Sequence, residues 1–76
     1  MIKIAETIAT MRKEKEMSQQ QLAKLCGVSI GAVSKWERGA AYPSIELLPK
    51  LARFFGISID ALIGYDMNAP ENNIDE

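Results

Sequence analysis

The segment spanning residues 18–39 constrains the fold more than any other part of the chain. It reads SQQQLAKLCGVSIGAVSKWERG, with serines and glycines at regular intervals. Ser18 stands three residues before a glutamine, the spacing of a capping box, and Ser29 can cap a second helix. Gly27 and Gly39 suit the left-handed conformation that ends many helices. The segment therefore predicts two short helices joined by a tight turn.

The two predicted helices carry small or apolar residues where they must cross. Ala23 and Gly27 are small on the first helix, and Val33 supplies the apolar contact from the second. Larger side chains at these positions would hold the helices apart. Two helices joined in this way form a helix-turn-helix, whose second helix lies in the major groove of DNA.

The second of these helices, about Ser29–Arg38, is the predicted recognition helix. If Val33 and Trp36 face the core, its outward face holds the expected base contacts, which are Ile30, Gly31, Ser34 and Lys35. Lysine can donate to guanine O6 and N7, and isoleucine can touch a thymine methyl group. Phosphate contacts are expected near the free N–H groups at the starts of the second and fourth helices, and at the ends of the recognition helix and in the loop after it. They are assigned to Ser18, Gln19, Ser29, Arg38, Tyr42 and Ser44.

Apolar spacing and caps predict five helices and no strand, a compact all-α fold. The expected helices cover residues 2–15, 18–27, 29–38, 44–56 and 58–64, with Ser44 and Ser58 starting the last two. Because Pro49 falls late in the first turn of the fourth helix, its regular hydrogen bonding is expected to start a few residues after Ser44. Their apolar faces should share one core. The predicted core residues are Ile8, Met11, Leu22, Cys26, Val33, Trp36, Leu48, Leu51, Phe55, Ile57 and Leu62.

The distribution of charge separates the body of the chain from its end. The 76 residues carry a net charge of −1. Residues 1–55 hold all nine lysines and arginines against five acidic residues, whereas residues 56–76 hold five acidic residues and no basic one. We therefore expect a DNA-binding domain over residues 1–65 and an acidic flexible tail or linker over 66–76. A linker would imply a longer parent protein with a further domain.

The composition argues against an enzyme and against a cofactor. The chain has no histidine, a single cysteine, and no glycine-rich phosphate loop, so no metal site is expected. Cys26 lies at a core spacing with Leu22 and is predicted to be a buried structural thiol. It cannot form an internal disulfide, which is compatible with a reducing cytoplasm, where we expect the protein. The chain contains no run of about 18 apolar residues, so no membrane span is predicted.

Five motifs in register resemble the Xre-type helix-turn-helix family, that of lambdoid phage repressor and Cro. They are MSQxxLA at 17–23, GVS at 27–29, VSKWERG at 33–39, LLPxLA at 47–52 and FxISxDxLIG at 55–64. The resemblance covers about Ile4 to Tyr65 and implies a five-helix, lambda-repressor-like fold. It further implies that Gln19 contacts phosphate and braces the recognition helix, and that Arg12 and Glu37 form a salt bridge between helices.

The chain departs from this family at two places. Members that read bases with glutamine or arginine have polar side chains where Ile30 and Gly31 stand here. Discrimination between DNA sequences is then low, or it rests on Lys35 and on the shape of the DNA. Glu16 stands where a glycine commonly ends the first helix. Either it carries about 1–2 kcal/mol of left-handed strain, or the turn differs.

These features favour a sequence-specific transcriptional regulator, most simply a repressor that blocks a promoter. An antitoxin or restriction-system controller with a protein partner would use the same domain. A protein-interaction module that no longer binds DNA is the third alternative. We expect a homodimer on double-stranded DNA, since such domains usually bind paired half-sites. Its interface is assigned to Ile59, Ile63 and Tyr65, which otherwise complete the core.

Overall fold

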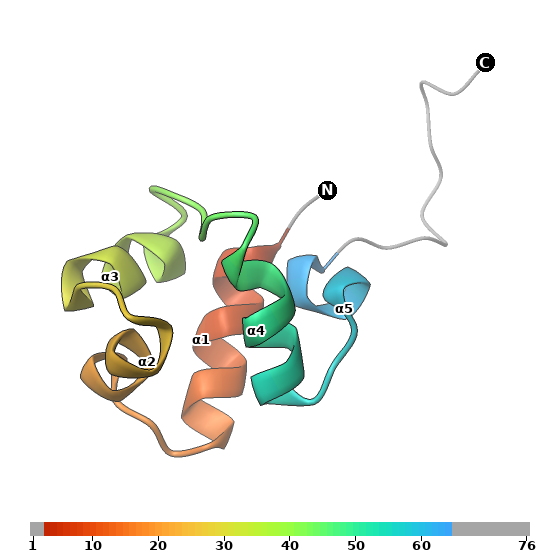
Figure 1. Ribbon diagram of the computed structural model, residues 1–76, viewed down its shortest axis with the longest axis horizontal. Helices are drawn as coiled ribbons and strands as arrows, with labels where there is room; N and C mark the ends of the chain where they lie inside the picture. The colour runs from red at the N-terminus through yellow and green to blue at the C-terminus, as the bar shows by residue number, and fades with distance from the viewer. Residues whose placement is uncertain (1–2, 65–76) are drawn as a thin grey trace.

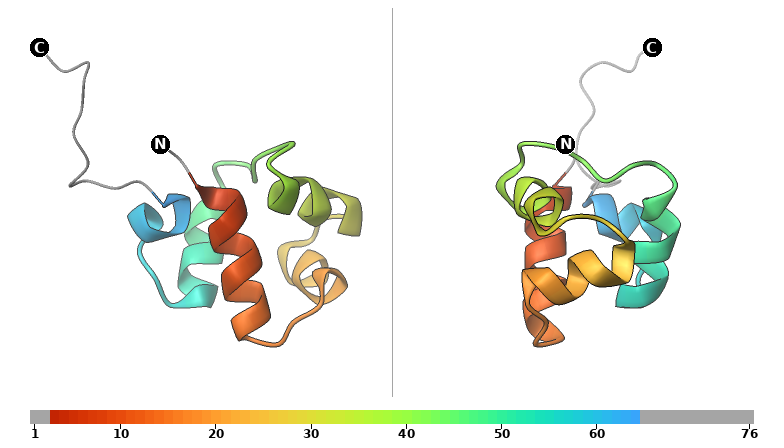
Figure 2. Two further views of the ribbon diagram at one scale, coloured as in Figure 1. Left: turned by 180° about the vertical axis from the view of Figure 1, so that it is seen from behind. Right: turned by 60° about the vertical axis from the view of Figure 1, so that its left-hand side comes forward.

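The computed structural model describes residues 3–64, and these residues form five α-helices without a strand. This confirms the all-α prediction. The helices are α1 (Ile4–Glu14), α2 (Gln19–Cys26), α3 (Ile30–Arg38), α4 (Leu47–Phe55) and α5 (Ile59–Ile63). Figure 1 shows α1 between two helix pairs, with α2 and α3 on one side and α4 and α5 on the other. The view from behind in Figure 2 gives the same arrangement.

The core lies where α1 meets both pairs. Its buried residues come from all five helices: Ile4, Ile8, Leu22, Ala23, Cys26, Val33, Trp36, Leu51, Ala52, Phe55 and Leu62. Eight of the eleven predicted core residues are among them. Met11, Leu48 and Ile57 are instead half-buried and pack against this cluster from its edge. The prediction did not include Ile4, Ala23 and Ala52 in the core, and all three are buried.

The turn between α1 and α2 contains the expected left-handed residue. α1 ends at Glu14, and Glu16 has a φ of 57°. The main-chain N–H of Glu16 donates to the Lys13 carbonyl at 2.9 Å, and that of Met17 donates to the Arg12 carbonyl at 3.1 Å. Glu16 therefore occupies a conformation that glycine adopts without steric cost.

The cap of α4 differs from the prediction. Ser44 does not cap this helix, because Leu47 is its first residue and Glu46, with a helical backbone and no capping side chain, precedes it. The chain makes a separate turn first, in which the Leu47 N–H donates to the Ser44 carbonyl at 2.9 Å. The Leu48 N–H donates to the Ile45 carbonyl at 3.4 Å. The ordered helix thus starts at Leu47, three residues after Ser44, as the position of Pro49 indicated.

The two ends of the described segment lie together. The Lys3 N–H donates to the Ile63 carbonyl at 2.6 Å, which links the start of α1 to the end of α5. Gly64 follows with a φ of 71°, and a Cβ at this position would lie 2.8 Å from the Lys3 Cβ. Glycine is therefore required here for its backbone conformation and for the close approach to Lys3.

Candidate nucleic-acid interface

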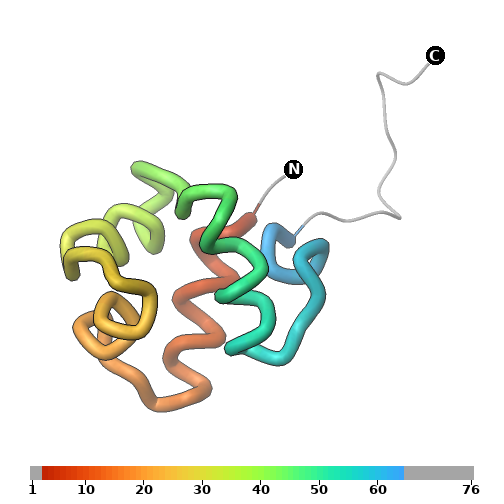
Figure 3. The backbone as a smooth tube through the Cα atoms, viewed as in Figure 1, coloured from red at the N-terminus to blue at the C-terminus, as the bar shows by residue number. Residues whose placement is uncertain are grey.

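Local caps fix both ends of α2 and the start of α3. The Ser18 Oγ accepts from the Gln21 N–H at 3.0 Å, and the Gln21 Oε1 accepts from the Ser18 N–H at 2.8 Å. Gly27 ends α2 with φ 71° and ψ 32°, and the Ser29 Oγ caps α3 by accepting from the Ala32 N–H at 3.1 Å. Figure 3 shows the short turn that results between the two helices. The predicted helix-turn-helix is thus present with its predicted caps.

α3 has one buried face and one exposed face. Val33 and Trp36 point into the core and are 0% and 4% exposed. The four predicted base contacts lie away from that core face: Ile30, Gly31 and Lys35 are exposed and Ser34 is half-buried. Ile30 has 52% of its surface exposed. The packing of α3 therefore presents the surface that the sequence indicated.

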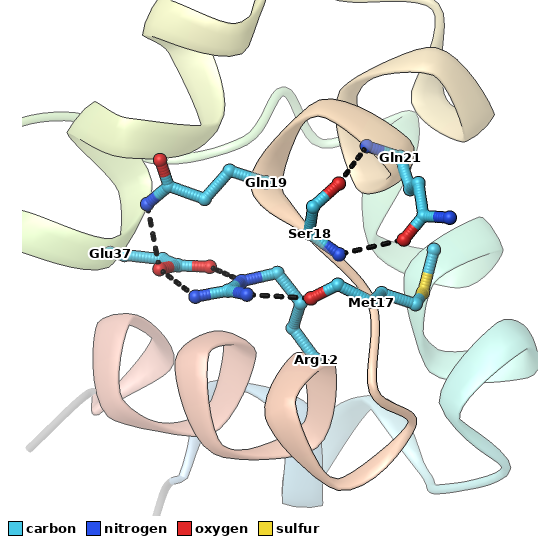
Figure 4. A network of polar contacts seen from close by, with 6 residues as sticks. All are labelled: Arg12, Met17, Ser18, Gln19, Gln21 and Glu37. Atoms are coloured by element: carbon cyan, nitrogen blue, oxygen red, sulfur yellow. Dashed lines mark hydrogen bonds and ion pairs between the residues drawn. The ribbon is translucent and has the colours of Figure 1, made fainter.

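A polar network holds α3 to α1 and α2 (Figure 4). The Arg12 Nε donates to the Glu37 Oε2 at 2.6 Å, and its Nη2 donates to the Glu37 Oε1 at 3.1 Å. The remaining Arg12 Nη1 donates to the Met17 carbonyl at 2.7 Å. The Gln19 Nε2 donates to the Glu37 Oε1 at 3.0 Å. Both the salt bridge and the bracing role of Gln19 are therefore present as the family resemblance implied.

The pKa values of Arg12 and Glu37 are shifted by burial and by the hydrogen bonds of this network. The Arg12 and Glu37 side chains are 12% and 9% exposed. Burial raises the pKa of Glu37, but hydrogen bonds from Arg12 and Gln19 outweigh it, so the pKa lies below its ordinary value. The hydrogen bond to Glu37 raises the pKa of Arg12. Both groups therefore stay charged at neutral pH.

Four of the predicted phosphate contacts lie at the ends of α2 and α3. Ser18 and Ser29 are exposed residues that precede α2 and α3, and Gln19 is half-buried at the start of α2. The main-chain N–H of Gln19 lies in the first turn of α2, where amides have no partner within a helix. Arg38 is exposed and its Nε donates to the Ser34 Oγ at 3.3 Å.

The loop after α3 carries the last two predicted phosphate contacts, Tyr42 and Ser44. Both are exposed, Tyr42 by 65%. Free amides directly after Ser44, where the fourth helix was expected to start, stay a prediction, but the first amides of α4 itself are not free. The Leu47 and Leu48 amides already donate to carbonyls of the preceding turn, and Pro49 has no N–H.

One of the predicted dimer residues, Ile63, borders an apolar hollow. Ile59 is 42% exposed and Ile63 is half-buried, while Tyr65 lies outside the described residues. Ile63 helps to line a hollow of about 270 Å³, together with Ile4, Tyr42, Pro43, Ile45 and Leu48. Sequence reasoning missed Ile45, which is 79% exposed.

A second hollow lies beside the first residue of α3. Its volume is about 520 Å³, and its lining residues are Gln20, Ala23, Lys24, Val28 and Ile30. Gln20 and Lys24 were not among the predicted contacts. Their spacing of four residues, on the exposed face of α2, was the available signal.

The described part of the chain offers no cluster of metal-ligating side chains. Residues 3–64 contain no group of three or more histidine, cysteine, aspartate or glutamate residues arranged to hold a metal ion. Cys26 is buried, as predicted, and burial raises the pKa of its thiol. Among residues 3–64, no helix has the length and apolar character needed to cross a membrane.

Comparison with known proteins places this geometry among characterised regulators. A family model described as helix-turn-helix matches residues 8–62. The HTH-type transcriptional activator BcrR of Enterococcus faecalis is 41% identical over 58 residues, covering 76% of this chain and 28% of that protein. The cryptic phage CTXphi transcriptional repressor RstR of Vibrio cholerae is 40% identical over 63 residues, covering 83% of this chain and 56% of that protein. The chain thus spans well under two thirds of the length of these relatives.

The fold is also similar to a solved protein–DNA complex. The structure of the P22 c2 repressor protein in complex with synthetic operator 9T has a TM-score of 0.75 and 36% sequence identity. The alignment covers 83% of this chain and 96% of that one.

Proposed function

Because this chain belongs to the helix-turn-helix family, we propose that it is a transcriptional regulator that binds double-stranded DNA with α3 in the major groove. The observation that carries the proposal is the fixed orientation of α3. Its inward face is anchored by Val33 and Trp36, and Glu37 joins it to Arg12 and Gln19. A helix held in this way presents one rigid face without needing to reorganise on binding.

We assign base contacts to Ile30, Gly31, Ser34 and Lys35 on that face. Phosphate contacts fall to the surrounding residues, namely Ser18, Gln19, Ser29, Arg38, Tyr42 and Ser44. Gln19 can use its main-chain N–H and its second amide hydrogen, since its first amide hydrogen is bonded to Glu37. Phosphate contacts fix the orientation of α3, and base contacts specify the sequence.

The protein acts as a homodimer on DNA in this proposal. Two copies related by a twofold axis would place their α3 helices in successive major grooves, about 34 Å apart. Ile59, Ile63 and Tyr65 belong to the interface, and the exposed Ile45, which lines the same hollow as Ile63, extends it. An apolar surface of this kind on a small domain suits contact with a second copy.

Repression by blocking a promoter is the proposed mode of action, with residues 1–65 as the DNA-binding domain and 66–76 as an acidic segment outside it. The relatives include both a repressor, RstR, and an activator, BcrR. Regulation rests on recognition in this proposal, with no catalytic step, and it takes place in the cytoplasm.

The test is DNA affinity across a salt series, using duplexes selected from a random library. The expected result is a site with two half-sites 10–10.5 bp apart, and affinity that falls steeply as salt rises. Lys35→Ala should lower affinity for the selected site about tenfold or more and relax the preference at one base pair. Lys50→Ala, which removes an exposed lysine from α4, is the matched control and should keep that preference.

Weak, unselective binding that Lys35→Ala leaves unchanged would contradict the proposal. It would favour a domain that binds a protein partner instead of DNA.

A further inference from the structure

The hollow beside the start of α3 combines an apolar wall with a cationic rim. Ala23 of α2, Val28 of the turn and Ile30 of α3 supply the apolar wall. Gln20 and Lys24, both exposed on α2, supply the polar rim. Ile30 leaves half of its surface in contact with solvent here, so burial of that surface is still available to a ligand.

Gly31 keeps the approach to Ile30 clear. A Cβ at this position would have the Ser29 Oγ, at 3.8 Å, as its nearest neighbour, and the φ of Gly31 is not positive. The fold therefore accepts a side chain at this position, and glycine costs the helix about 0.5–1 kcal/mol relative to alanine. Without a side chain at residue 31, a base edge can come close to the helix backbone and to Ile30.

The major groove offers one apolar group at a base edge, the C5-methyl group of thymine. The charged residue in the lining is Lys24, which complements a phosphate. We propose that this hollow receives the 5-methyl group of a thymine, which contacts Ile30, while Lys24 binds the phosphate beside it. The inference rests on the proposed function and names the base that Ile30 selects.

DNA suits this hollow better than an apolar protein segment does. Two of the five lining residues, Gln20 and Lys24, are polar, so an apolar side chain that filled this hollow would have to displace water from both. A methyl group on a base needs contact with the wall alone. The adjoining phosphate then lies on the side where the cation is.

The experiment replaces each thymine of the selected duplex, one at a time, by deoxyuridine, which removes the methyl group and changes nothing else. One position in each half-site should lose about fourfold in affinity per replacement, equivalent to about 0.8 kcal/mol for one buried carbon group. In Ile30→Ala the same replacement should have no effect, so that the two changes are not additive. Thr10→Ala, which shortens an exposed side chain of α1 outside both proposed contact surfaces, should retain the fourfold ratio.

Lys24→Gln tests the rim separately. It should lower affinity equally for the thymine and deoxyuridine duplexes and reduce the salt slope by about one. If no thymine is sensitive in the unchanged protein, or if the sensitivity survives in Ile30→Ala, the inference is overturned while sequence-specific binding still stands. If no duplex is selected and affinity does not depend on salt, the proposed function fails as well.

Discussion

Glu16 is the one non-glycine residue with a positive φ among residues 3–64. Its side chain is exposed and lies in the turn between α1 and α2. The left-handed conformation costs an ordinary residue about 1–2 kcal/mol. Residues of the network around Arg12 flank this turn, since Met17 follows Glu16 directly and accepts a hydrogen bond from Arg12.

We predict that Glu16→Gly raises the free energy of unfolding by about 1 kcal/mol, because glycine relieves the left-handed strain and this gain exceeds its greater chain entropy. Urea denaturation measures the change as a higher midpoint. Ala9→Gly, in the middle of α1, is the control and should lower stability by about 1 kcal/mol. Equal destabilisation by both substitutions would rule out strain at residue 16.

At the scale of single elements, Glu37 couples α3 to both of its neighbours. Its carboxylate accepts from Arg12 of α1 and from Gln19 of α2. The pair is largely buried, so the loss of one partner leaves a poorly solvated charge. The position of the recognition helix therefore depends on the ionised state of this one side chain.

We predict that the stabilisation from Glu37 depends on pH. The pKa of Glu37 is lower in the folded protein than in the unfolded chain. Its contribution is therefore complete above the ordinary glutamate pKa of about 4.3, and it is lost as the pH falls through that value and then through the folded pKa. Glu37→Gln should cost about 3 kcal/mol at pH 7 and progressively less in acid.

Urea unfolding of both proteins between pH 7 and pH 3 measures this difference. Glu6→Gln serves as a control, because Glu6 is exposed on α1. A gap between wild type and Glu37→Gln that stays constant down to pH 3 would be inconsistent with a depressed pKa.

The sequence predicted those element boundaries that local side chains determine. Ser18, Ser29 and Ser58 each cap the helix that follows, as expected from their spacing. Ser44 misled the prediction because a serine in a turn can resemble a cap. A helix starting at Ser44 would have included Ile45 in its first turn, whereas the separate turn before Leu47 leaves Ile45 on the surface.

The candidate site was predictable in its outline and not in its surroundings. Ile30, Gly31 and Lys35 were assigned correctly to the exposed face of α3, because the inward positions of Val33 and Trp36 determine that face. The hydrogen bond between Gln19 and Glu37 joins residues 18 apart, so only the resemblance implied it. The hollow beside Ile30 depends on how α2 crosses α3, which spacing alone does not give.

At the scale of the whole molecule, the recognition surface and the apolar hollow lined by Ile63 come from different helices. The hollow brings together the start of α1, the loop after α3 and the end of α5. Ile45 is its most exposed residue and makes little contribution to the core. A substitution at Ile45 can therefore test the proposed contact between copies without unfolding the domain.

We predict that Ile45→Asp weakens pairing of two copies on DNA and changes stability by less than about 0.5 kcal/mol, as is usual for exposed positions. The new charge would have to be desolvated in the interface. The measurement compares affinity for a duplex with two half-sites and for a duplex with one. Thr10→Asp adds the same charge to an exposed position on α1 and should preserve the advantage of two half-sites. An unchanged advantage in Ile45→Asp would remove this surface from the interface.

The hydrogen bond between Lys3 and Ile63 holds the two ends of the described segment side by side. Because the first and last described residues meet, both connections to any neighbouring polypeptide leave from the same region. α5 lies across α1 from the α2–α3 pair (Figure 1), so a neighbour joined after Gly64 starts on the far side of the molecule from α2. The same domain can therefore form part of proteins of very different length. This agrees with the relatives, of which this chain covers 28% in one case and 56% in another.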